Sequence, residues 1–389
     1  MDELSIDWMF PGGEGGARLG KRTVVVPGAL PGETVRAKVP AGKGLGRAEE
    51  ISVITPSAHR QAPPCPYTAH CGGCDLAHAE PSQRLAWLAA THARSLGLDA
   101  LPITASPRRD ARARVRLSVD NGKIGYRAPR SHDLVSIDTC SIARPEIQTI
   151  IGKLAALPAD AFHTVENIEL RSDGERCVAD VDGRSLSQAL LDVLQHVAIK
   201  GRVICGDPTL WLDNGGPLLR ASPGTFFQVN HEVNRAMVAW IVEQAEGVKS
   251  VADLYAGIGN FTLPLAQMGA HVRSVETVQS AVADCSASAR KAGLADRITA
   301  VATDADRYRP EENFVELIVL DPPRRGCSAL IKRIGVARTP RVILVSCDPR
   351  SAVRDTKLLR ESGYKLKAAR GFDLFPDTHH VELATAWAR

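Results

Sequence analysis

The sequence has no apolar run long enough to span a bilayer, no internal repeat and no low-complexity tract. Its first ten residues, MDELSIDWMF, carry acidic side chains where a secretory signal would have a basic start and an apolar core. These absences argue against membrane and secreted proteins, so we expect a cytoplasmic protein with no membrane partner. The chain has 389 residues, of which 44% are hydrophobic and 24% charged, as in a soluble globular protein of two or three domains.

The chain also lacks a dominant charge. Its formal net charge is only +4, so charge balance alone does not indicate a nucleic-acid partner. The basic residues are nevertheless uneven, because seven arginines and one lysine lie between Arg108 and Arg130. Arg112, Arg114 and Arg116 alternate with apolar residues, which on a strand places the guanidinium groups on one face. Such a row suits RNA phosphates, and it equally suits a solvated edge strand that resists aggregation.

Nine cysteines are present, and an odd number in a cytoplasmic protein argues against a disulfide framework. Three of them crowd together in CPYTAHCGGC, as Cys65, Cys71 and Cys74. This spacing plus one remote cysteine gives four thiolates, which suit either an iron–sulfur cluster or a structural zinc ion. Four others are scattered, and we expect them to be small core residues: Cys177, Cys205, Cys285 and Cys327.

The first sixty residues have the pattern of a compact all-β module. Glycines punctuate short runs of β-branched residues such as TVVVPGAL and ETVRAKV. Basic residues accompany these runs: Lys21, Arg22, Lys38, Lys43 and Arg47. We expect a small β-barrel over residues 1–58 that binds RNA, the alternative being an accessory barrel without a ligand.

The middle of the chain, residues 59–217, predicts a mixed α+β unit. It begins near the proline-rich joint QAPPCP, and Asn121-Gly122 is a pair typical of a hairpin turn. The expected helices span about 82–96, 145–160 and 186–197, and the expected strands about 112–140, 165–182 and 202–212.

From about Leu218 the pattern alternates between buried strands and segments of helix length. Five apolar runs indicate the strands: SVADLY, HVRSVE, ITAVAT, VELIVLD and RVILVS. This alternation predicts a doubly wound, Rossmann-like α/β sheet over residues 218–389. Ligands of such sheets bind beyond the carboxyl ends of the strands, so residues just after these runs are the candidates for a site.

The first of these strands leads into the glycine turn of DLYAGIGNFTLPLA, with a helix expected from about Asn260. Gly257 in such a turn lets the backbone approach a ligand closely. Glu276 ends the next strand and can hydrogen-bond ribose hydroxyls, and Asp304 follows the third strand, where an adenine contact is expected. A dinucleotide fingerprint would carry a third glycine where Thr262 stands, so the loop favours S-adenosylmethionine over NAD.

Three more residues near the strand ends carry chemistry. Asp321 follows the fourth strand, in DPPRRG, and Cys347 follows the fifth, in VSCDP. A cysteine there is either a core thiol or a nucleophile; the Asp-Pro that follows would break the strand and leave the thiol at the rim, which favours the nucleophile. His379 and His380 have no further zinc ligands nearby in the sequence, which argues against a zinc site. Glu382 follows them, and its carboxylate suits a general base.

A thiol and a base beside a methyl donor fit the methylation of a pyrimidine ring. Carbon 5 of uracil is a poor nucleophile until a thiolate adds to carbon 6 and makes carbon 5 electron-rich. After methyl transfer a base must remove the carbon 5 proton, so that the thiolate is expelled. The uridine must also leave any stacked helix before its ring can be attacked.

These motifs together resemble the bacterial RNA uridine-5-methyltransferases, which act on transfer RNA or large-subunit ribosomal RNA. The resemblance covers essentially the full length, because the motifs occur in family order. They are the cysteine segment, a later DTC, FFQVN, the glycine loop, DPPRRG, VSCDP and HHVE. It implies that Cys347 is the nucleophile and Glu382 the base. It implies a donor site formed by Gln228, Tyr255, Asn260, Glu276, Asp304 and Asp321, and a [4Fe–4S] cluster held by Cys65, Cys71, Cys74 and Cys140.

The N-terminal module resembles a TRAM domain, an RNA-binding barrel, which favours 23S ribosomal RNA over transfer RNA as the substrate. The chain would then comprise this barrel, a central iron–sulfur and RNA-binding domain and a methyltransferase domain, acting as a monomer. A radical enzyme is disfavoured because it usually carries Cys-x3-Cys-x2-Cys. An amino-group methyltransferase is disfavoured because Arg324 follows the two prolines, where an aromatic residue is usual. A non-catalytic iron–sulfur RNA-binding protein would leave Cys347 and Glu382 without a role.

Overall fold

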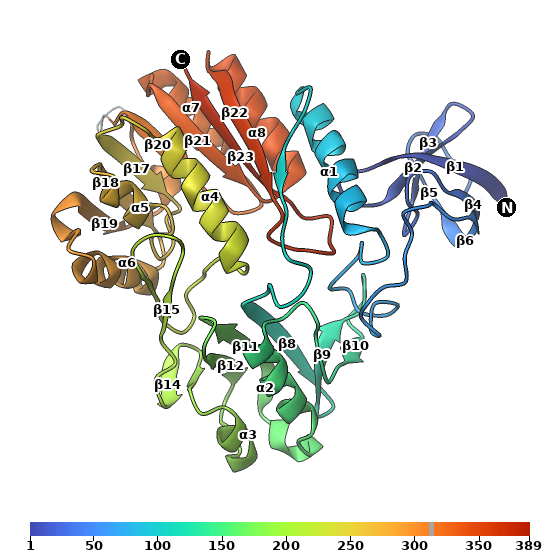
Figure 1. The fold of residues 1–389 in the computed structure, drawn as a ribbon, viewed down its shortest axis with the longest axis horizontal. Helices are drawn as coiled ribbons and strands as arrows, with labels where there is room; N and C mark the ends of the chain where they lie inside the picture. Colours follow the sequence, from blue (N-terminus) through green and yellow to red (C-terminus); the bar gives the residue numbers. More distant parts are fainter. Residues whose placement is uncertain (311–314) are drawn as a thin grey trace.

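The computed structural model describes residues 1–310 and 315–389. It is a mixed α/β protein with sheets of six, seven and eight strands and a small two-stranded sheet. Figure 1 shows the six-stranded sheet projecting at the N-terminal end, with helix α1 between it and the eight-stranded sheet, which with its helices forms the largest part. The seven-stranded sheet lies below both in this view.

The N-terminal sheet is an open half-barrel. Its order is β5-β3-β2-β1-β4-β6, so β5 and β6 are its edges instead of closing a full barrel. The strands are β1 Asp2–Met9, β2 Gly15–Leu19, β3 Arg22–Val26, β4 Thr34–Lys38, β5 Gly46–Arg47 and β6 Glu49–Thr55. Apolar residues that alternate along them, including Leu4, Ile6, Val24 and Val35, form its core. The predicted all-β module is confirmed.

Helix α1, Pro81–Leu96, confirms the helix predicted at 82–96. The carboxylate of Glu80 accepts hydrogen bonds from backbone N–H groups of the first turn, where Pro81 has no N–H to satisfy. Gly97 ends the helix with a positive φ of 67°. The buried face of α1 packs against the half-barrel and the C-terminal part of the chain.

The central seven-stranded sheet has the order β10-β9-β8-β11-β12-β13-β14. Its strands are β8 Arg114–Asp120, β9 Lys123–Arg127, β10 Leu134–Ser136, β11 Val165–Ser172, β12 Cys177–Gly183, β13 Val197–Ile199 and β14 Arg202–Cys205. The helical segments beside it are α2 Pro145–Ala155, η1 Ala159–Phe162 and α3 Gln188–Val193. Asn121 and Gly122 join β8 to β9, both with positive φ, which confirms the predicted hairpin turn.

Two strand predictions in this region were too long. The strand predicted at 165–182 is the antiparallel pair β11 and β12, joined through Gly174, which has a φ of 106°. The strand predicted at 202–212 is divided between β14 and β15, which belong to different sheets. The two predicted helices are present but shorter, as α2 and α3.

The arginine strand has the predicted two faces. Val115 and Leu117 of β8 are buried in the core of the central sheet, whereas Arg114 and Arg116 face outward. Both arginines already have partners, because Arg114 pairs with Glu169 at 2.9 Å and Arg116 with Asp182 at 2.5 Å. The outer face is therefore a mixed-charge surface instead of a bare row of guanidinium groups.

The eight-stranded sheet has the order β19-β18-β17-β20-β21-β23-β22-β7. Its strands are β7 Ile103–Thr104, β17 Ser250–Leu254, β18 His271–Glu276, β19 Ile298–Ala302, β20 Leu317–Leu320, β21 Arg341–Ser346, β22 Lys365–Phe372 and β23 Glu382–Ala388. The helical segments are α4 His231–Gln244, α5 Thr262–Gln267, α6 Gln279–Lys291, η2 Ala295–Arg297, η3 Ala305–Arg307, α7 Ser328–Ala337 and α8 Pro349–Glu361. The short strands β15 Leu210–Leu212 and β16 Leu219–Ala221 pair beside α6.

All five predicted strands of this sheet are present, and β17 to β21 are parallel, as a doubly wound sheet requires. One apolar cluster packs α4 and α5 against the sheet, and a second packs α7 and α8 against it. The winding reverses between β17 and β20, so the carboxyl ends of these strands flank the switch point where such folds bind ligands.

The central region also contributes to the C-terminal sheet, because β7 pairs with β22. The domain boundaries near residues 59 and 218 stay predictions. In the part of the chain that the structure covers, no helix has the length and apolar character needed to cross a bilayer.

Candidate active site and cysteine cavity

A cavity of about 640 Å³ opens at the carboxyl edge of the eight-stranded sheet. Both predicted catalytic residues, Cys347 and Glu382, line it. It is also lined by the predicted donor-site residues Gln228, Tyr255, Gly257, Glu276, Asp304 and Asp321. Asn260 lines a smaller adjoining cavity instead. The fold thus gathers residues that are far apart in the sequence around one space.

The strand register places Cys347 opposite Glu382. In the antiparallel pair of β21 and β23, Ser346 faces Leu383, so the next residues, Cys347 and Glu382, face each other across the end of the pair. On its other side Glu382 pairs with Phe372 of β22. The two neighbouring strands therefore hold the backbone of Glu382 beside Cys347, and the start of β23 directs its carboxyl group.

Cys347 is half-buried at the rim of the sheet. The carboxylate of Asp348 accepts hydrogen bonds from the backbone N–H groups of Arg350 at 3.0 Å and Ser351 at 2.9 Å, and so caps α8. Asp348-Pro349 therefore ends β21 and begins a helix. The N-terminal end of α8, with its partial positive charge, lies next to the thiol and favours the thiolate.

Burial shifts the acid–base groups of the cavity toward their neutral forms. It raises the pKa of Glu382 to about 8 and the pKa of Asp321 to about 7. It also raises the pKa of the Cys347 thiol to about 12, and the nearby carboxyls of Glu382 and Asp321 add to this shift. The guanidinium group of Arg324 lowers the pKa of both Cys347 and Glu382. Positive charge in the cavity thus favours ionisation.

One oxygen of Glu382 is left without a partner. Its Oε2 is buried and makes no hydrogen bond to the described residues. A buried carboxyl oxygen without a partner costs roughly 1–3 kcal/mol. Such a cost is tolerated where the group has a chemical task, which makes Glu382 a strong candidate for one.

The glycine loop after β17 adopts a backbone that few residues allow. Tyr255 has a φ of 64°, Gly257 of 54° and Gly259 of 94°. A Cβ at Gly259 would lie 2.5 Å from Leu263 and 2.8 Å from Cys285, so only glycine lets the loop pack on α5 and α6. The glycines therefore let the loop backbone lie at the wall of the cavity.

Asn260 is held by two other asparagines. Its Nδ2 donates to Oδ1 of Asn234 at 2.9 Å, and its Oδ1 accepts from Nδ2 of Asn234 at 2.9 Å. Asn214 donates from Nδ2 to the backbone oxygen of Asn260 at 3.0 Å. Sequence reasoning missed Asn214 and Asn234. It also placed the helix start at Asn260, whereas α5 begins at Thr262.

Glu276 at the end of β18 and Asp304 just after β19 line the same cavity. Oε2 of Glu276 accepts a hydrogen bond from the backbone N–H of Gly257 at 3.0 Å. Oδ1 of Asp304 accepts from the backbone N–H of Asp306 at 2.9 Å, and the Tyr255 hydroxyl donates to Asp306 at 2.5 Å. Burial and this bond raise the pKa of Tyr255. The carboxylates suit hydrogen bonds to a nucleoside.

Sequence reasoning missed two aromatic side chains of this cavity, Phe226 and Phe375. Phe226 is 56% exposed, and Cζ of Arg114 lies 4.9 Å from its ring centroid. Phe375 packs edge-on against His380, with 5.8 Å between ring centroids. Rings at the mouth of a cavity suit stacking with unpaired nucleobases. The double phenylalanine of FFQVN was the signal for Phe226; nothing local marked Phe375.

The four predicted ligand cysteines line a second cavity, of about 270 Å³: Cys65, Cys71, Cys74 and Cys140. The Tyr126 hydroxyl lies 3.7 Å from Sγ of Cys140. Burial raises the pKa of Cys74 to about 12. Over residues 1–310 and 315–389, no three His, Cys, Asp or Glu side chains form a group that could hold a single metal ion. The four thiols are instead spread around a shared space.

The remaining cysteines only partly follow expectation. Cys285 and Cys327 are buried in apolar clusters, as predicted. Cys177 is half-buried, and Cys205 is exposed on β14 at the edge of the central sheet, so the prediction of a core position was wrong for Cys205. β14 is an edge strand without a layer packed over Cys205, which local sequence does not reveal.

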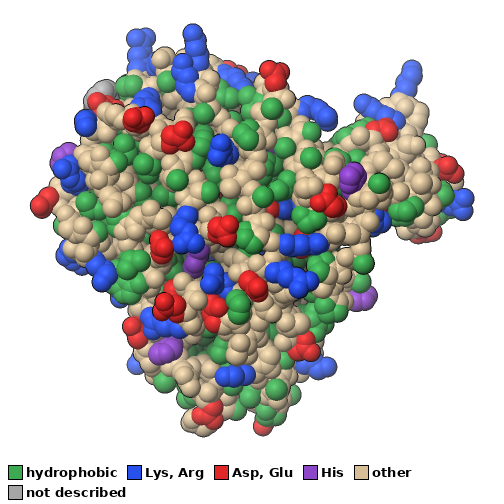
Figure 2. Space-filling view, viewed as in Figure 1, with side chains coloured by type: hydrophobic (Ala, Val, Ile, Leu, Met, Phe, Trp, Pro, Cys, Tyr) green, Lys and Arg blue, Asp and Glu red, His purple; other side chains and the backbone are tan. Residues whose placement is uncertain are grey.

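Figure 2 shows lysine and arginine side chains, mixed with acidic ones, along the middle of one face, where the central and C-terminal parts meet. It also shows the half-barrel standing out to the side. A face of this kind can contact a phosphate backbone at several separate points without a single basic patch.

Known proteins similar to this chain decide its family. The family model described as tRNA (Uracil-5-)-methyltransferase matches residues 209–388. The 23S rRNA (uracil(1939)-C(5))-methyltransferase RlmD of Chromohalobacter salexigens is 33% identical, over 98% of this chain and 88% of its own. This chain belongs to the RNA (uracil-5-)-methyltransferase family. It is an S-adenosylmethionine-dependent enzyme that methylates carbon 5 of uracil in RNA.

Other relatives extend the match over the full length of the methyltransferase. An RNA methyltransferase of Caulobacter vibrioides, described as uncharacterized, is 31% identical over 100% of both chains. RlmD of a Shewanella species is 32% identical, over 95% of this chain and 92% of its own. The solved structure of Pyrococcus abyssi tRNA (uracil-54, C5)-methyltransferase in complex with S-adenosyl-L-homocysteine covers 99% of both chains with a TM-score of 0.80 at 21% identity. The methyltransferase thus shares that protein's whole fold, half-barrel included.

Proposed function

We propose that this methyltransferase works through a covalent adduct between Cys347 and carbon 6 of uracil, and that Glu382 is the base that resolves the adduct. The register of β21 and β23 carries this proposal, because it sets Cys347 and Glu382 side by side at one edge of the cavity. A nucleophile and a base next to each other at the edge of one ring can act in succession on its neighbouring carbons 6 and 5.

The first step needs the thiolate of Cys347. Its Sγ forms a bond to carbon 6, and the electron pair of the carbon 5–carbon 6 double bond moves toward oxygen 4, so that carbon 5 becomes nucleophilic. The half-buried position at the rim lets the thiol proton leave to solvent. Arg324 and the N-terminal end of α8 favour the anion against the effect of burial.

When bound, S-adenosylmethionine supplies an electrophilic methyl group on a positively charged sulfonium. The residues that would hold it are Gln228, Tyr255, Gly257, Asn260, Glu276, Asp304 and Asp321. The fit is supported by the positive-φ glycine loop, which allows close backbone approach, and by the carboxylates after β18, β19 and β20.

Glu382 acts in the last step. It removes the proton from carbon 5, the electron pair of that bond restores the double bond, and the bond between carbon 6 and Sγ breaks. The buried Oε2 without a partner is free to accept this proton. A pKa of about 8 places the group close to neutral pH, which suits a base that must take up a proton and later lose it.

We favour 23S ribosomal RNA as the substrate, because relatives at 33% and 32% identity carry that activity in their names. The half-barrel, proposed as a TRAM-like RNA-binding module, does not decide between the RNAs, since the Pyrococcus abyssi protein named for tRNA shares it within a 99% match. The test is incubation with labelled donor and separate unmodified transfer and ribosomal RNA pools. Label in 23S RNA supports the proposal, and label in transfer RNA alone would contradict the choice of RNA.

We also propose that Cys65, Cys71, Cys74 and Cys140 hold a [4Fe–4S] cluster. The four thiols surround a cavity of about 270 Å³, far more than a single ion needs, and thiolates are the ligands of such clusters. Structural zinc is the alternative, because four thiolates suit zinc as well. Analysis of anaerobically purified protein should find about four iron and four sulfide per chain. One zinc per chain, without sulfide, would contradict the cluster.

A further inference from the structure

The loop between β22 and β23 separates the two cavities. Asp377 of this loop lines the cysteine cavity, whereas Phe375 and His380 line the active-site cavity. Glu382 begins β23 directly after the loop. A shift of the loop would therefore move the carboxyl that we propose as the base.

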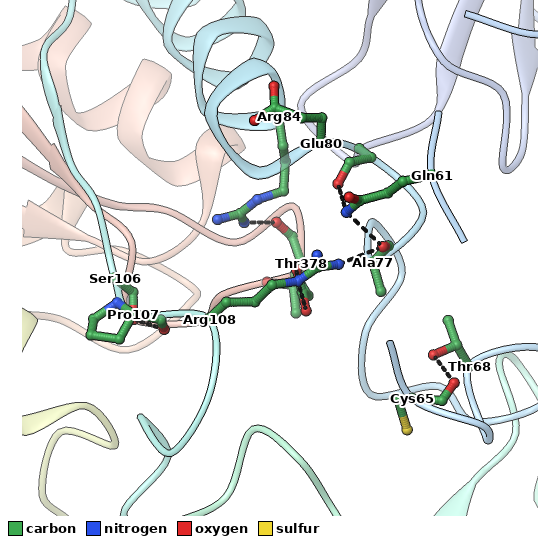
Figure 3. A network of polar contacts seen from close by, with 12 residues as sticks. Gln61, Cys65, Thr68, Ala77, Glu80, Arg84, Ser106, Pro107, Arg108 and Thr378 are labelled. Carbon is green, nitrogen blue, oxygen red and sulfur yellow. Dashed lines mark hydrogen bonds and ion pairs between the residues drawn. The ribbon is translucent and has the colours of Figure 1, made fainter. Parts of the chain in front are cut away.

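Arg84 of α1 holds the loop from one side, and Figure 3 shows it extending from the helix toward Thr378. Its Nη1 donates to the backbone oxygen of Thr378 at 2.6 Å, and its Nη2 pairs with the carboxylate of Asp373. Both members of this pair are almost completely buried. An ion pair buried so deeply requires well-fixed geometry, so α1 sets the position of the loop backbone.

Arg108 ties the loop to residues 65–77, which contain three of the four clustered cysteines and are called the cysteine segment below (Figure 3). Its Nη2 donates to the backbone oxygen of Ala77 at 2.7 Å, and its Nε donates to the carboxylate of Asp377 at 2.9 and 3.0 Å. The backbone N–H of Leu76 donates to the backbone oxygen of Asp377 at 2.9 Å. Asp377 has a φ of 63°, a left-handed conformation that needs such support.

A third connection runs through two histidines whose rings are in contact. Asp75, next to Cys74, accepts a hydrogen bond from the backbone N–H of His379 at 3.1 Å and pairs with its Nδ1. The ring of His379 contacts the ring of His380 at an interplanar angle of 38°, with 4.0 Å between centroids. The cysteine segment is thus attached to the loop at Asp377 and at His379, both within five residues of Glu382 in the sequence.

We propose that Arg108 and Asp377 are positioning residues for proton abstraction, because they transmit the position of the cysteine segment to Glu382. This inference rests on the proposed role of Glu382 as the base. Cys347 is placed by β21 and the start of α8, and the donor loop by β17 and α5. Loss of the contacts between Arg108 and Asp377 should therefore slow release of the methylated product much more than it slows addition of the thiolate or binding of the donor.

The test uses Arg108→Met and the conservative Arg108→Lys in the full chain, with Arg341→Met as a matched control. Arg341 also donates to backbone oxygens, among them that of Glu246 at 2.9 Å, but at the opposite end of β21. Each variant is mixed with substrate RNA and labelled donor for a single turnover and quenched in detergent. Gel electrophoresis then separates covalent protein–RNA complex from free methylated RNA, and calorimetry gives the affinity for the donor.

We expect Arg108→Met to accumulate methylated covalent complex, because its release slows by roughly tenfold or more while donor affinity stays within about twofold. Arg108→Lys should fall between this variant and the parent, and Arg341→Met should release product normally. If Arg108→Met does not fold, Asp377→Asn removes the same ion pair with a smaller change and should also accumulate complex.

The proposal is overturned if Arg108→Met, or Asp377→Asn in its place, slows addition and release equally. It is also overturned if the variant releases product at the parent rate while Glu382→Gln retains the covalent complex. Normal release by Glu382→Gln itself would have a different meaning, since it would remove Glu382 as the base and overturn the proposed function together with this inference.

Discussion

Replacing Glu382 with glutamine should stabilise the protein, and the gain should grow as the pH rises. The side chain is 6% exposed, and burial raises its pKa to about 8 from an ordinary value of 4.5. Between these values the unfolded chain has lost the proton and the folded chain has kept it. The unfolded state thus binds fewer protons, so stability falls with rising pH across this interval. Glutamine has nearly the same shape and does not ionise.

The two pKa values set the size of the effect. The interval from 4.5 to 8 is 3.5 units, and each unit corresponds to about 1.4 kcal/mol, so the full cost approaches about 5 kcal/mol above pH 8. At pH 7 about 3 kcal/mol of it has accumulated. Even half of the value at pH 7 is a large stabilisation for one substitution. In a chain of this length, half of the value at pH 7 corresponds to a rise in Tm of roughly 2 °C.

Thermal unfolding of the parent and Glu382→Gln between about pH 5 and pH 8.5 measures the difference. Glu246→Gln, which removes an exposed carboxyl at the end of α4, is the control and should follow the parent at every pH. The Tm curves of the parent and Glu382→Gln should converge toward pH 5 and separate above it. A gap that is constant, or a variant less stable than the parent at pH 8, would refute the reasoning.

Three further predictions follow from the same residues. Cys347→Ala should abolish methylation while RNA affinity in filter binding stays unchanged. Methylation by this variant at the parent rate would contradict the covalent mechanism. In single-turnover experiments, the rate at which methylated RNA is released should rise with pH and level off above about pH 8, because Glu382 must be ionised to accept the carbon 5 proton; a release rate that falls across this range would argue against its role. Gly259→Ala should lower stability by roughly 2 kcal/mol or more and weaken donor binding in calorimetry, because its Cβ would lie 2.5 Å from Leu263 at a φ of 94°. Gly269→Ala is its control, with a similar φ of 106° but nothing within 4 Å of the added carbon, so it should leave donor affinity unchanged.

The C-terminal sheet could be predicted from the sequence for a physical reason. Strands buried on both faces are continuous apolar runs, and the residues predicted to do chemistry follow those runs directly, as Asp321 follows β20 and Cys347 follows β21. The pairing of Cys347 with Glu382 could not be predicted this way. It depends on β23 entering antiparallel between β21 and β22, which is a property of the whole sheet.

The central region was harder to predict because its contacts are not local. The alternation along β8 predicted which side chains face outward, but the carboxylates that pair with Arg114 and Arg116 come from β11 and β12. The single strand expected at 165–182 missed the turn at Gly174, because β-branched residues continue on both sides of it.

The contacts that hold the loop between β22 and β23 were invisible in the sequence. Arg84 lies in a helix that showed no functional pattern, and Arg108 was singled out only as the start of a basic stretch. Their partners Asp373 and Asp377 lie far away near the C-terminus. Only the folded chain brings α1, the cysteine segment and the loop before Glu382 to one place.

A direct test of the covalent mechanism uses substrate RNA with 5-fluorouridine at the target position. Fluorine at carbon 5 cannot be removed as a proton, so after methyl transfer the adduct cannot be resolved. Mass spectrometry should find the parent protein joined through Cys347 to methylated RNA, and Cys347→Ala should form no such complex. A parent enzyme that forms no complex, or one joined through another residue, would contradict the account.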